Sequence, residues 1–337
     1  MGYKTPAKGI GALAAVRIDI RWHPGLSVYA SEPFLRAVAD EYGWIGGVNS
    51  EGVLRCILPY TIIRKAHIRL ARFRVETVPL DRELEIYEEK TFLDDAMNLL
   101  RSLGAAIVIP ASTNTLFRTY PDGATAAPYG SHIIDLSNSE DILWKNIHPK
   151  HRNVIRNAEK KGVEIRSGLA YADIAFDLIQ ATFKRSRLRF MNRASFLRMV
   201  QGLGERVEVF IASHAGEIQG CAVLPFSAYC AYYAYGGTAS GPLTGAMNLL
   251  QWRSICHFLG LGVGRYDFCG ARLDPEKGSK QAGLTMYKER FGAPLHRGFI
   301  WKYPLRTVPS IIYSWAVCAN RGGDIVDQER RRMAKES

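Results

Sequence analysis

The sequence lacks a long apolar run. No stretch approaches the ~18 consecutive apolar residues that cross a bilayer, and the nearest one, residues 308–319, is interrupted by Pro309, Ser310 and Ser314. We expect this segment to form a helix docked on the body of the protein, with a position on a membrane surface as the less favoured alternative. The first residues carry no sustained apolar region, so no signal peptide is expected.

Cysteine is also scarce, and the eight histidines are scattered. No two cysteines are spaced as metal ligands, and most lie in apolar runs where a thiol behaves as a small core side chain. We therefore expect no metal, no bound cofactor, reduced thiols and a cytoplasmic protein. No Ser-His-Asp or Cys-His arrangement stands out. The six cysteines stand at positions 56, 221, 230, 256, 269 and 318.

Acidic residues are outnumbered. The chain has 32 Asp and Glu against 44 Lys and Arg, which gives a net charge of +12 and a pI near 9.4. This surplus favours a polyanionic partner such as RNA, nucleotide phosphates or an anionic membrane face, although many soluble proteins are basic without one. With 337 residues and 47% hydrophobic content, the chain can form two globular domains. Disorder is expected only at residues 1–11 and 321–337.

Proline and glycine indicate the ends of the expected helices and strands in the second half of the sequence. Pro149 and Gly162 stand where a helix begins and ends, and short turns separate three successive apolar runs, which predicts an antiparallel meander. The expected helices are 149–161, 171–185, 193–202, 242–259 and 283–291. The expected strands are 163–166, 207–212, 218–226, 229–235, 265–268 and 297–303.

The first half has a similar but looser order of elements. Helices are expected at 32–42 and 91–103, and strands at 44–48, 53–59, 105–109, 114–119 and 124–135. The predicted domains are therefore 12–138 and 139–303, followed by a C-terminal helix and tail at 304–337 that packs on the first domain.

Two basic clusters are candidates for binding substrate phosphates. Arg152 and Arg156 share one face of the helix 149–161 with Lys160, and arginine can grip a phosphate with two parallel hydrogen bonds. His151 adds to the charge nearby. Arg189 and Arg193 are interleaved with aromatic residues, an arrangement that suits a nucleotide or a single-stranded RNA end. A solvated helix face and a flexible basic loop are the alternatives.

An aromatic segment and a small-residue loop follow one another. Alternation along the expected strand 229–235 places Tyr233 and Tyr235 on one face, where a hydroxyl could bind an acceptor, although core packing explains most tyrosines of this kind. The loop 238–245 then opens a helix. It contains glycines but no leading Arg or Gln, and Pro242 lacks an amide N–H, so it fits the pyrophosphate of coenzyme A poorly.

A carboxylate and a lysine complete the candidate site. Asp267 ends a short apolar strand, and Lys288 lies between apolar and aromatic neighbours that include Tyr287 and Phe291. An ammonium in such surroundings needs an anionic partner and could stabilise an oxyanion during acyl transfer. A structural cap for Asp267 and a lysine that snorkels to solvent are the alternatives.

These motifs together resemble the FemAB family of non-ribosomal peptidyl transferases. The resemblance is carried by residues 143–163, with the run Arg152-Asn-Val-Ile-Arg-Asn-Ala158 before Gly162-Val163, by Tyr266-Asp-Phe268, and by Tyr287-Lys-Glu-Arg-Phe-Gly292. It implies an α/β (α+β) fold of two tandem GNAT-like acyltransferase domains, with mixed, mostly antiparallel sheets flanked by helices. It also implies that Lys288 stabilises the oxyanion of the transferred acyl group.

The resemblance implies an aminoacyltransferase that moves an amino acid from aminoacyl-tRNA to an amine of a peptidoglycan precursor or another small metabolite. Direct transfer from an ester to an amine needs only positioning and charge stabilisation. Lys288, Tyr235 and Asp267 are then the candidate catalytic residues. The other candidates are an acyl-CoA-dependent N-acyltransferase acting on a sugar, lipid or peptide amine, and a non-catalytic RNA-binding or scaffold protein. The candidate substrate-binding residues are Arg152, Arg156, Arg189, Arg193, Tyr233, Tyr287 and Phe291.

Overall fold

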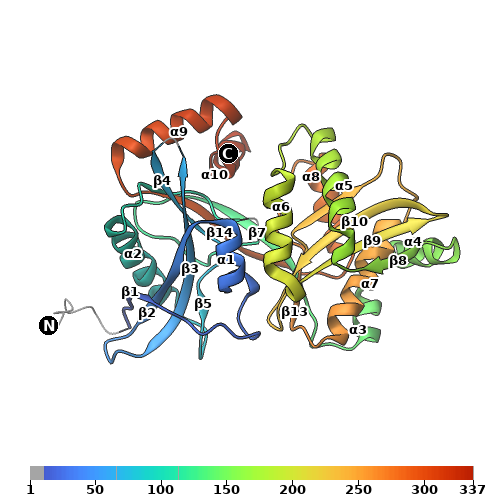
Figure 1. The fold of residues 1–337 in the computed structure, drawn as a ribbon, viewed down its shortest axis with the longest axis horizontal. Helices are drawn as coiled ribbons and strands as arrows, with labels where there is room; N and C mark the ends of the chain where they lie inside the picture. Colours follow the sequence, from blue (N-terminus) through green and yellow to red (C-terminus); the bar gives the residue numbers. More distant parts are fainter. Residues whose placement is uncertain (1–10, 66, 113, 337) are drawn as a thin grey trace. The chain divides into compact units, whose positions relative to one another are not determined.

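The computed structural model describes residues 11–65, 67–112 and 114–336. They form two compact units (Figure 1). Residues 11–21, 39–129 and 297–336 belong to unit 1, and residues 22–38 and 130–296 belong to unit 2. The domain boundaries expected from the sequence stay a prediction.

Unit 1 is built on four antiparallel strands, β1 to β4, and β6 pairs in parallel with β4. The strands β1 to β4 pair in sequence order, β4 pairs with β6, and β6 pairs with β14. Helix α2 (Ile86–Ser102) buries Phe92, Leu93 and Ala96 against this core, where Phe73 and Trp301 meet. The strands are β1 (Ala14–Ile18), β2 (Glu41–Val48), β3 (Leu54–Lys65), β4 (Ile68–Phe73), β5 (Val78–Pro79), β6 (Ile107–Val108) and β14 (Leu295–Pro304).

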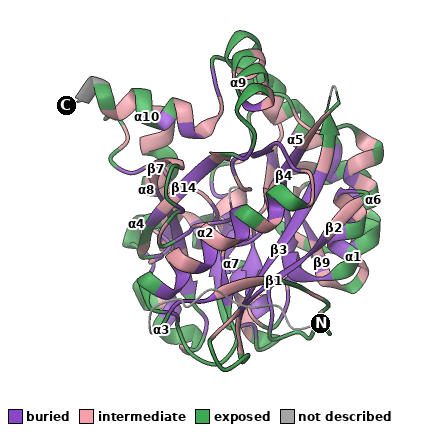
Figure 2. Cartoon of the chain, turned by 90° about the vertical axis from the view of Figure 1, so that its left-hand side faces the viewer, coloured by how far each residue is buried: buried purple, intermediate pink, exposed green. Residues whose placement is uncertain are grey.

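Two further helices complete unit 1. Helix α9 (Thr307–Arg321) confirms the helix expected near residues 308–319. Helix α10 (Ile325–Glu336) occupies the segment expected to be disordered, so that expectation is wrong. The physical reason is local: Val326 is buried in a small cluster, and the Lys302 ammonium binds Asp324 at 2.9 Å and Asp327 at 2.5 Å. Figure 2 shows how much of α9 is exposed to solvent.

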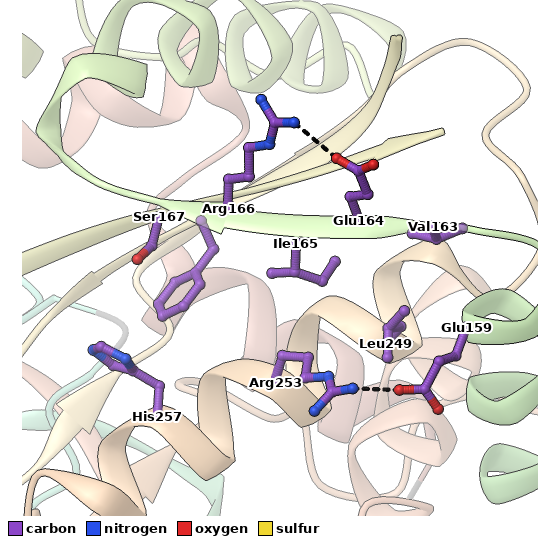
Figure 3. Close-up of a pocket in the computed structure, with 10 residues that line it drawn as sticks. Glu159, Val163, Glu164, Ile165, Arg166, Ser167, Leu249, Arg253 and His257 are labelled. Atoms are coloured by element: carbon purple, nitrogen blue, oxygen red, sulfur yellow. Dashed lines mark hydrogen bonds and ion pairs between the residues drawn. The ribbon is translucent and has the colours of Figure 1, made fainter. Parts of the chain in front are cut away.

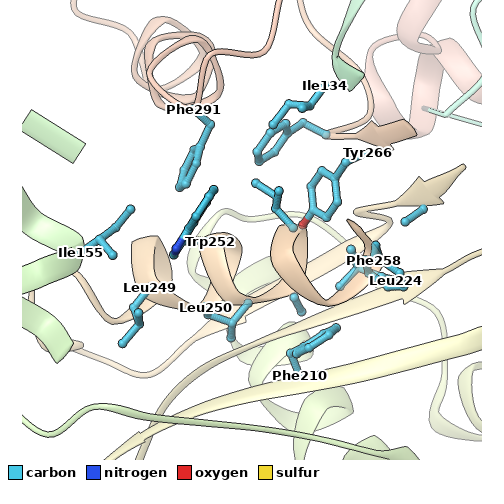
Figure 4. Close-up of a cluster of buried hydrophobic side chains, with 14 of the residues drawn as sticks. Ile134, Ile155, Phe210, Leu224, Leu249, Leu250, Trp252, Phe258, Tyr266 and Phe291 are labelled. Atoms are coloured by element: carbon cyan, nitrogen blue, oxygen red, sulfur yellow. The ribbon is translucent and has the colours of Figure 1, made fainter. Parts of the chain in front are cut away.

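Unit 2 contains a four-stranded antiparallel sheet in the order β12-β10-β9-β8. Helices α5 and α7 pack on its opposite faces: a Cβ on Gly237 would meet Leu178 of α5, and one on Gly220 would meet Met247 of α7. Figure 4 shows the core that α7 forms with side chains such as Tyr266 and Phe291. The strands are β8 (Glu164–Ser167), β9 (Val207–His214), β10 (Glu217–Pro225) and β12 (Tyr235–Thr238). The helices are α3 (Glu140–Asn146), α4 (Pro149–Lys160), α5 (Ala172–Arg185), α6 (Arg193–Leu203), α7 (Ala246–Gly260) and α8 (Lys280–Glu289).

The expected third strand of the meander, residues 229–235, is wrong. The chain there divides into β11 (Ala231–Tyr232), which pairs in parallel with β13 (Arg265–Asp267), and β12, which pairs with β10. Strand β13 pairs on its other side with the end of β7 (Thr125–Asp135). The division requires Gly236, because a Cβ at this position would collide with the hydroxyl of Tyr233. Tyr232 of β11 and Tyr235 of β12 therefore lie in separate ladders.

Two expected helix boundaries also differ, and one expected strand does not form. The helix expected at 32–42 ends at Val38, as α1 (Glu32–Val38), and residues from Glu41 onward pair in β2. Helix α7 begins at Ala246 because Gly245 has φ +94°, which is outside helical geometry. In the segment expected as a strand at 114–119, Phe117 makes only an isolated bridge to Phe299. A short 3₁₀ turn, η1 (Val28–Ala30), precedes α1 in unit 2.

Candidate active site

A tight turn follows β13 and gathers the charged groups of unit 2. Cys269 has φ 52° and Gly270 has φ 40°, so the chain reverses within two residues of Asp267. The Asp267 carboxylate accepts a hydrogen bond from the Cys269 amide at 2.7 Å and another from the Ser131 hydroxyl. The turn therefore folds back on the carboxylate that precedes it, as an Asx-type turn does.

Asp267 is 4% exposed, and burial raises its pKa to about 6. Two influences oppose that rise. The hydrogen bonds from Ser131 and Cys269 favour the charged carboxylate, and so do the charges of Lys288 and Arg265. Asp267 thus changes its charge close to neutral pH, unlike an ordinary surface carboxylate.

Lys288 reaches the same turn from the last turn of α8. Its ammonium donates to the carbonyl oxygen of Gly270 at 2.7 Å and to that of Cys269. Burial lowers the pKa of this lysine, and the nearby Cys269 and Asp267 oppose the change. An ammonium has three N–H donors, and these two bonds are the ones it makes within the described residues. One donor remains for a substrate oxygen.

Tyr29 joins this cluster from a distant part of the sequence. It is 5% exposed, and burial raises its pKa well above the usual value, with further contributions from nearby Cys269, Tyr235 and Asp267. Its ring packs on Tyr232 at 4.7 Å between centroids. The segment of η1 therefore brings a phenol beside the predicted catalytic residues Asp267 and Tyr235.

Tyr235 packs against two phenylalanine rings beside this cluster. Its ring lies 5.3 Å from that of Phe190 and 6.3 Å from that of Phe196, both edge-on. Phe190 belongs to the loop between α5 and α6. The loop, β12 and the Asp267 turn thus supply neighbouring parts of one candidate site.

The remaining predicted tyrosines and Phe291 lie in the core below the turn. Tyr233 and Tyr287 have pKa values well above the usual value because they are buried, and the Tyr287 hydroxyl donates to the Met247 carbonyl at 3.2 Å. Phe291 packs on Phe268 with 5.5 Å between ring centroids. All three side chains pack in or against the core of unit 2. Their predicted part in substrate binding stays a prediction.

His151 was expected to add positive charge on α4, and that expectation is wrong. The ring is 6% exposed and packs against Tyr287 and Phe291. Burial and the positive charge of Arg290 lower its pKa to about 4, so the ring is neutral at pH 7.

The arginines of α4 are engaged with α3. Arg152 donates to the carbonyl oxygen of Lys145 at 3.1 Å, and the Arg156 guanidinium lies 5.4 Å from the Trp144 ring centre. Arg156 is exposed, and Arg152 is half-buried. These contacts cap and cover the end of α3, and the described residues bring neither arginine into contact with Lys288.

The arginines near α6 differ from one another. Arg193 forms ion pairs with Asp173 and Asp177 of α5, and it stacks on Phe176 at 4.5 Å. Arg189 is exposed in the loop between α5 and α6. Of the two, Arg189 presents its charge to solvent more openly.

Two further cations lie beside that loop. Arg185 donates to the carbonyl oxygen of Thr238 at 2.5 Å, at the end of β12. Lys280, at the start of α8, donates to the Ser186 hydroxyl at 2.6 Å. Together with Arg189, these exposed residues define what we call the loop cations: Arg185, Arg189 and Lys280. Arg185 thus contacts the end of β12, which carries Tyr235, and Lys280 begins α8, which carries Lys288.

The small-residue loop before α7 already uses several of its amides. Ala239 donates to the Gln219 carbonyl at 3.0 Å, Leu243 to the Gln219 side chain at 2.8 Å, and Ala246 to the Leu243 carbonyl at 3.1 Å. Pro242 has no N–H. These internal bonds leave the loop few donors for a pyrophosphate, which agrees with the expectation from its sequence.

A separate pocket of about 540 Å³ lies beneath the edge strand β8 (Figure 3). Its charged side chains are paired with each other, Glu164 with Arg166 and Glu159 with Arg253. It contains none of the predicted site residues. The predicted residues Asp267, which is buried, and Lys288, which is half-buried, lie instead at the Asp267 turn.

Sequence reasoning missed Ser131, Tyr29 and the loop cation Lys280. A serine inside an apolar strand is a weak signal, and no local pattern links residues 22–38 with a turn more than 200 positions later.

Across the described residues, no group of three or more His, Cys, Asp or Glu side chains is arranged to hold a metal ion. Within the same residues, no helix is long and apolar enough to cross a membrane.

Comparison with known proteins agrees with this architecture. Residues 149–288 match the family model described as an acetyltransferase (GNAT) domain. The structure of FemX is similar with a TM-score of 0.60 and 15% identity, covering 86% of this chain and 93% of that one. No curated protein matches the sequence significantly.

Two further structures share the fold. One is the C-terminal domain (DUF2156) assigned to a lysylphosphatidylglycerol synthetase of Agrobacterium fabrum, with a TM-score of 0.51 and 12% identity over 86% of this chain and 95% of that one. The other is L-PGS from Bacillus licheniformis, with a TM-score of 0.50 and 10% identity over 83% and 89%.

The chain therefore has a two-domain, mixed α/β fold of the GNAT-like class, as expected. The resemblance to the FemAB family is confirmed as a likeness of fold. Together, the family model and the fold support an acyltransferase.

Proposed function

We propose that this protein transfers an aminoacyl group from aminoacyl-tRNA to an amine of a peptidoglycan precursor or another small metabolite. The amine nitrogen attacks the ester carbonyl carbon, a C–N bond forms, and the C–O bond to the ribose breaks. The ribose oxygen leaves with the proton that the amine gives up. No covalent enzyme intermediate is required.

Lys288 is the observation that carries the proposal. Its ammonium is held by the carbonyl oxygens of Cys269 and Gly270, and one N–H remains for the carbonyl oxygen of a substrate. Burial strengthens that interaction because little water screens it. A fixed cation at this point stabilises the oxyanion of the tetrahedral intermediate, which is commonly worth ~10²–10³ in rate.

The loop cations and the basic surplus support an RNA donor. Arg185 binds the end of β12, which carries Tyr235. Lys280 begins α8, which carries Lys288, and it binds Ser186 next to Arg185. Arg189 is exposed in the same loop as Ser186. The 3′ end of a tRNA presents phosphates to such residues and unstacked bases to aromatic rings such as Phe190. The name of the Agrobacterium relative, lysylphosphatidylglycerol synthetase, also refers to an aminoacyl product.

An acyl-CoA donor is the second candidate, because residues 149–288 match an acetyltransferase model. The loop before α7 argues against it. Three of its amides donate within the protein and Pro242 supplies none. The acyl-CoA would have to hold its pyrophosphate elsewhere.

A transfer assay with two donor arms tests the proposal. Purified protein is incubated with a mixed tRNA pool charged with labelled amino acids and a small-amine extract, with and without ribonuclease. A parallel arm supplies labelled acetyl-CoA. We expect label to enter a small product only while the RNA is intact. Transfer in the acetyl-CoA arm alone would overturn the RNA donor.

The variant Lys288→Met separates catalysis from scaffolding. We expect transfer to fall by ~10²–10³ with RNA binding retained. The matched control is Lys90→Met in unit 1, a lysine that pairs with Asp94 and Asp122 and should leave transfer unchanged. Full activity in Lys288→Met would show that the ammonium plays no part in the chemistry.

A further inference from the structure

Helix α9 exposes a stripe of large apolar side chains. Val308, Ile311, Ile312 and Trp315 are 66%, 63%, 54% and 74% exposed. Their spacing of i, i+3, i+4 and i+7 places them along one side of the helix. Cys318 continues that side and is exposed as well. We call these five residues the α9 stripe.

The opposite side of the helix is fixed to unit 1. The Ser310 hydroxyl donates to the Ala106 carbonyl at 2.9 Å, and Tyr313 packs against the cluster of Leu70, Ile107 and Ile109. The stripe is therefore held outward by the fold. Exposed apolar patches of this kind mark interaction sites when they gather on one element.

Positive charge surrounds the stripe. Arg306 precedes α9 and Arg321 ends it, and both are exposed. Lys65, the last residue of β3, is also exposed, and Ile63 of the same strand packs in the same cluster as Tyr313. No acidic residue occurs between Arg297 and Gly323. The acids that follow, Asp324 and Asp327, are bound to Lys302.

We propose that the α9 stripe is a docking surface for an anionic phospholipid bilayer. Tryptophan and branched aliphatic side chains suit the boundary between head groups and acyl chains, and arginine or lysine at the margins binds anionic head groups. The helix lies in the plane of the membrane surface. A second copy of this chain would find the same basic margin and meet repulsion of like charges.

Vesicle flotation of the full chain tests this surface. The vesicles contain phosphatidylglycerol and phosphatidylcholine, or phosphatidylcholine alone. We expect binding at least tenfold stronger to the anionic vesicles. The variant Ile311→Ser/Trp315→Ser should lose at least tenfold of that binding, and Lys65→Glu/Arg321→Glu should abolish the preference for anionic lipid.

The matched control is Ile142→Ser/Leu261→Ser, which changes two apolar residues of unit 2 that are 45% and 54% exposed. It should bind vesicles as the natural chain does. An environment-sensitive fluorophore on Cys318 adds a direct readout, since its emission should shift to the blue when vesicles are added.

Two outcomes would overturn the proposal. One is equal vesicle binding by the natural chain and the stripe variant. The other is a natural chain that does not bind anionic vesicles but elutes as a dimer, while the stripe variant elutes as a monomer. The second result would assign the stripe to contact between copies of this chain.

Discussion

At the scale of single residues, the Asp267 turn combines two groups whose usual charge states are disfavoured by burial and favoured by each other. Burial raises the pKa of Asp267 to about 6 and lowers the pKa of Lys288. The two charges partly offset these shifts, and the hydrogen bond from Ser131 favours the carboxylate further. Pairs of groups whose pKa values are shifted by burial and by a charged partner are concentrated at functional sites.

The pKa of Asp267 predicts a pH-dependent stability. The pKa of the Asp267 carboxyl rises from 3.8 to about 6 on folding. Between these two pH values the folded protein therefore holds a proton that the unfolded chain has released. Stability from this group is full below pH 4 and falls as the pH rises through 6. Replacing Asp267 by Asn keeps an acceptor for Ser131 and removes the titration. We expect Asn to gain about 2 kcal/mol over Asp at pH 7.5 relative to pH 4.5.

Urea unfolding of both proteins at pH 4.5 and 7.5 measures this difference. Asp135→Asn is the control, because this exposed carboxylate has a pKa lowered from 3.8 and its effect on stability should be nearly the same at pH 4.5 and 7.5. An effect of Asp267→Asn that is the same at both pH values would show that Asp267 is charged throughout this range.

Asp267 and Lys288 were predictable as single residues, because a charged group in an apolar stretch is visible in a sequence. Their partners were not. Ser131 and Tyr29 reach the turn through β7 and η1, and the contacts depend on pairing between segments more than 130 positions apart. The neutral state of His151 was missed for the same reason, since its burial depends on Tyr287 and Phe291.

At the scale of elements, local sequence signals predicted the helices of the second half well. They did not predict the strand pairing between segments that lie far apart in the sequence. Helices α4, α5 and α6 begin and end within two residues of the expected positions, because caps and breakers are local. The division of residues 229–235 depends on β13, which lies some 30 positions later. Helix α10 depends on Lys302, which no pattern within residues 321–337 could reveal.

The contact of α1 with α6 in unit 2 gives a prediction at this scale. A Cβ on Gly202 of α6 would lie 2.9 Å from the Cβ of Ala37, closer than side chains tolerate. Gly202→Ala gains helix propensity of about 1 kcal/mol but meets Ala37. We expect the gain to appear fully only when Ala37→Gly makes room, with a coupling of about 1–2 kcal/mol in the double-mutant cycle.

Thermal or urea unfolding of the four proteins provides the cycle. The comparison Gly260→Ala, at a helical glycine with open space around a Cβ, should show the propensity gain without any dependence on Ala37. Additivity of Gly202→Ala and Ala37→Gly within 0.3–0.5 kcal/mol would mean that α1 and α6 do not press on each other.

At the scale of the whole molecule, the net charge of +12 sets how any RNA partner is held. Lysine and arginine that neutralise phosphates release counterions, so the logarithm of affinity falls with the logarithm of salt concentration by about 0.7 for each contact to a single strand. The same charge acts on membranes and on free phosphates. The slope, rather than the affinity, counts the contacts that a given surface makes.

The loop cations should therefore appear in the salt dependence of tRNA binding. Filter binding of an uncharged tRNA pool across a potassium chloride series gives the slope for the natural chain and for Arg189→Gln/Lys280→Gln. We expect the double variant to lower the slope by about 1.4, or about 0.7 for each lost cation. Arg36→Gln is the control, since this exposed arginine of α1 pairs with Glu32 at 2.5 Å and lies on a different element. If Arg36→Gln lowers the slope as much per charge, binding follows net charge alone, and the loop cations hold no particular phosphates. An unchanged slope in the double variant would place the RNA on another face of the protein.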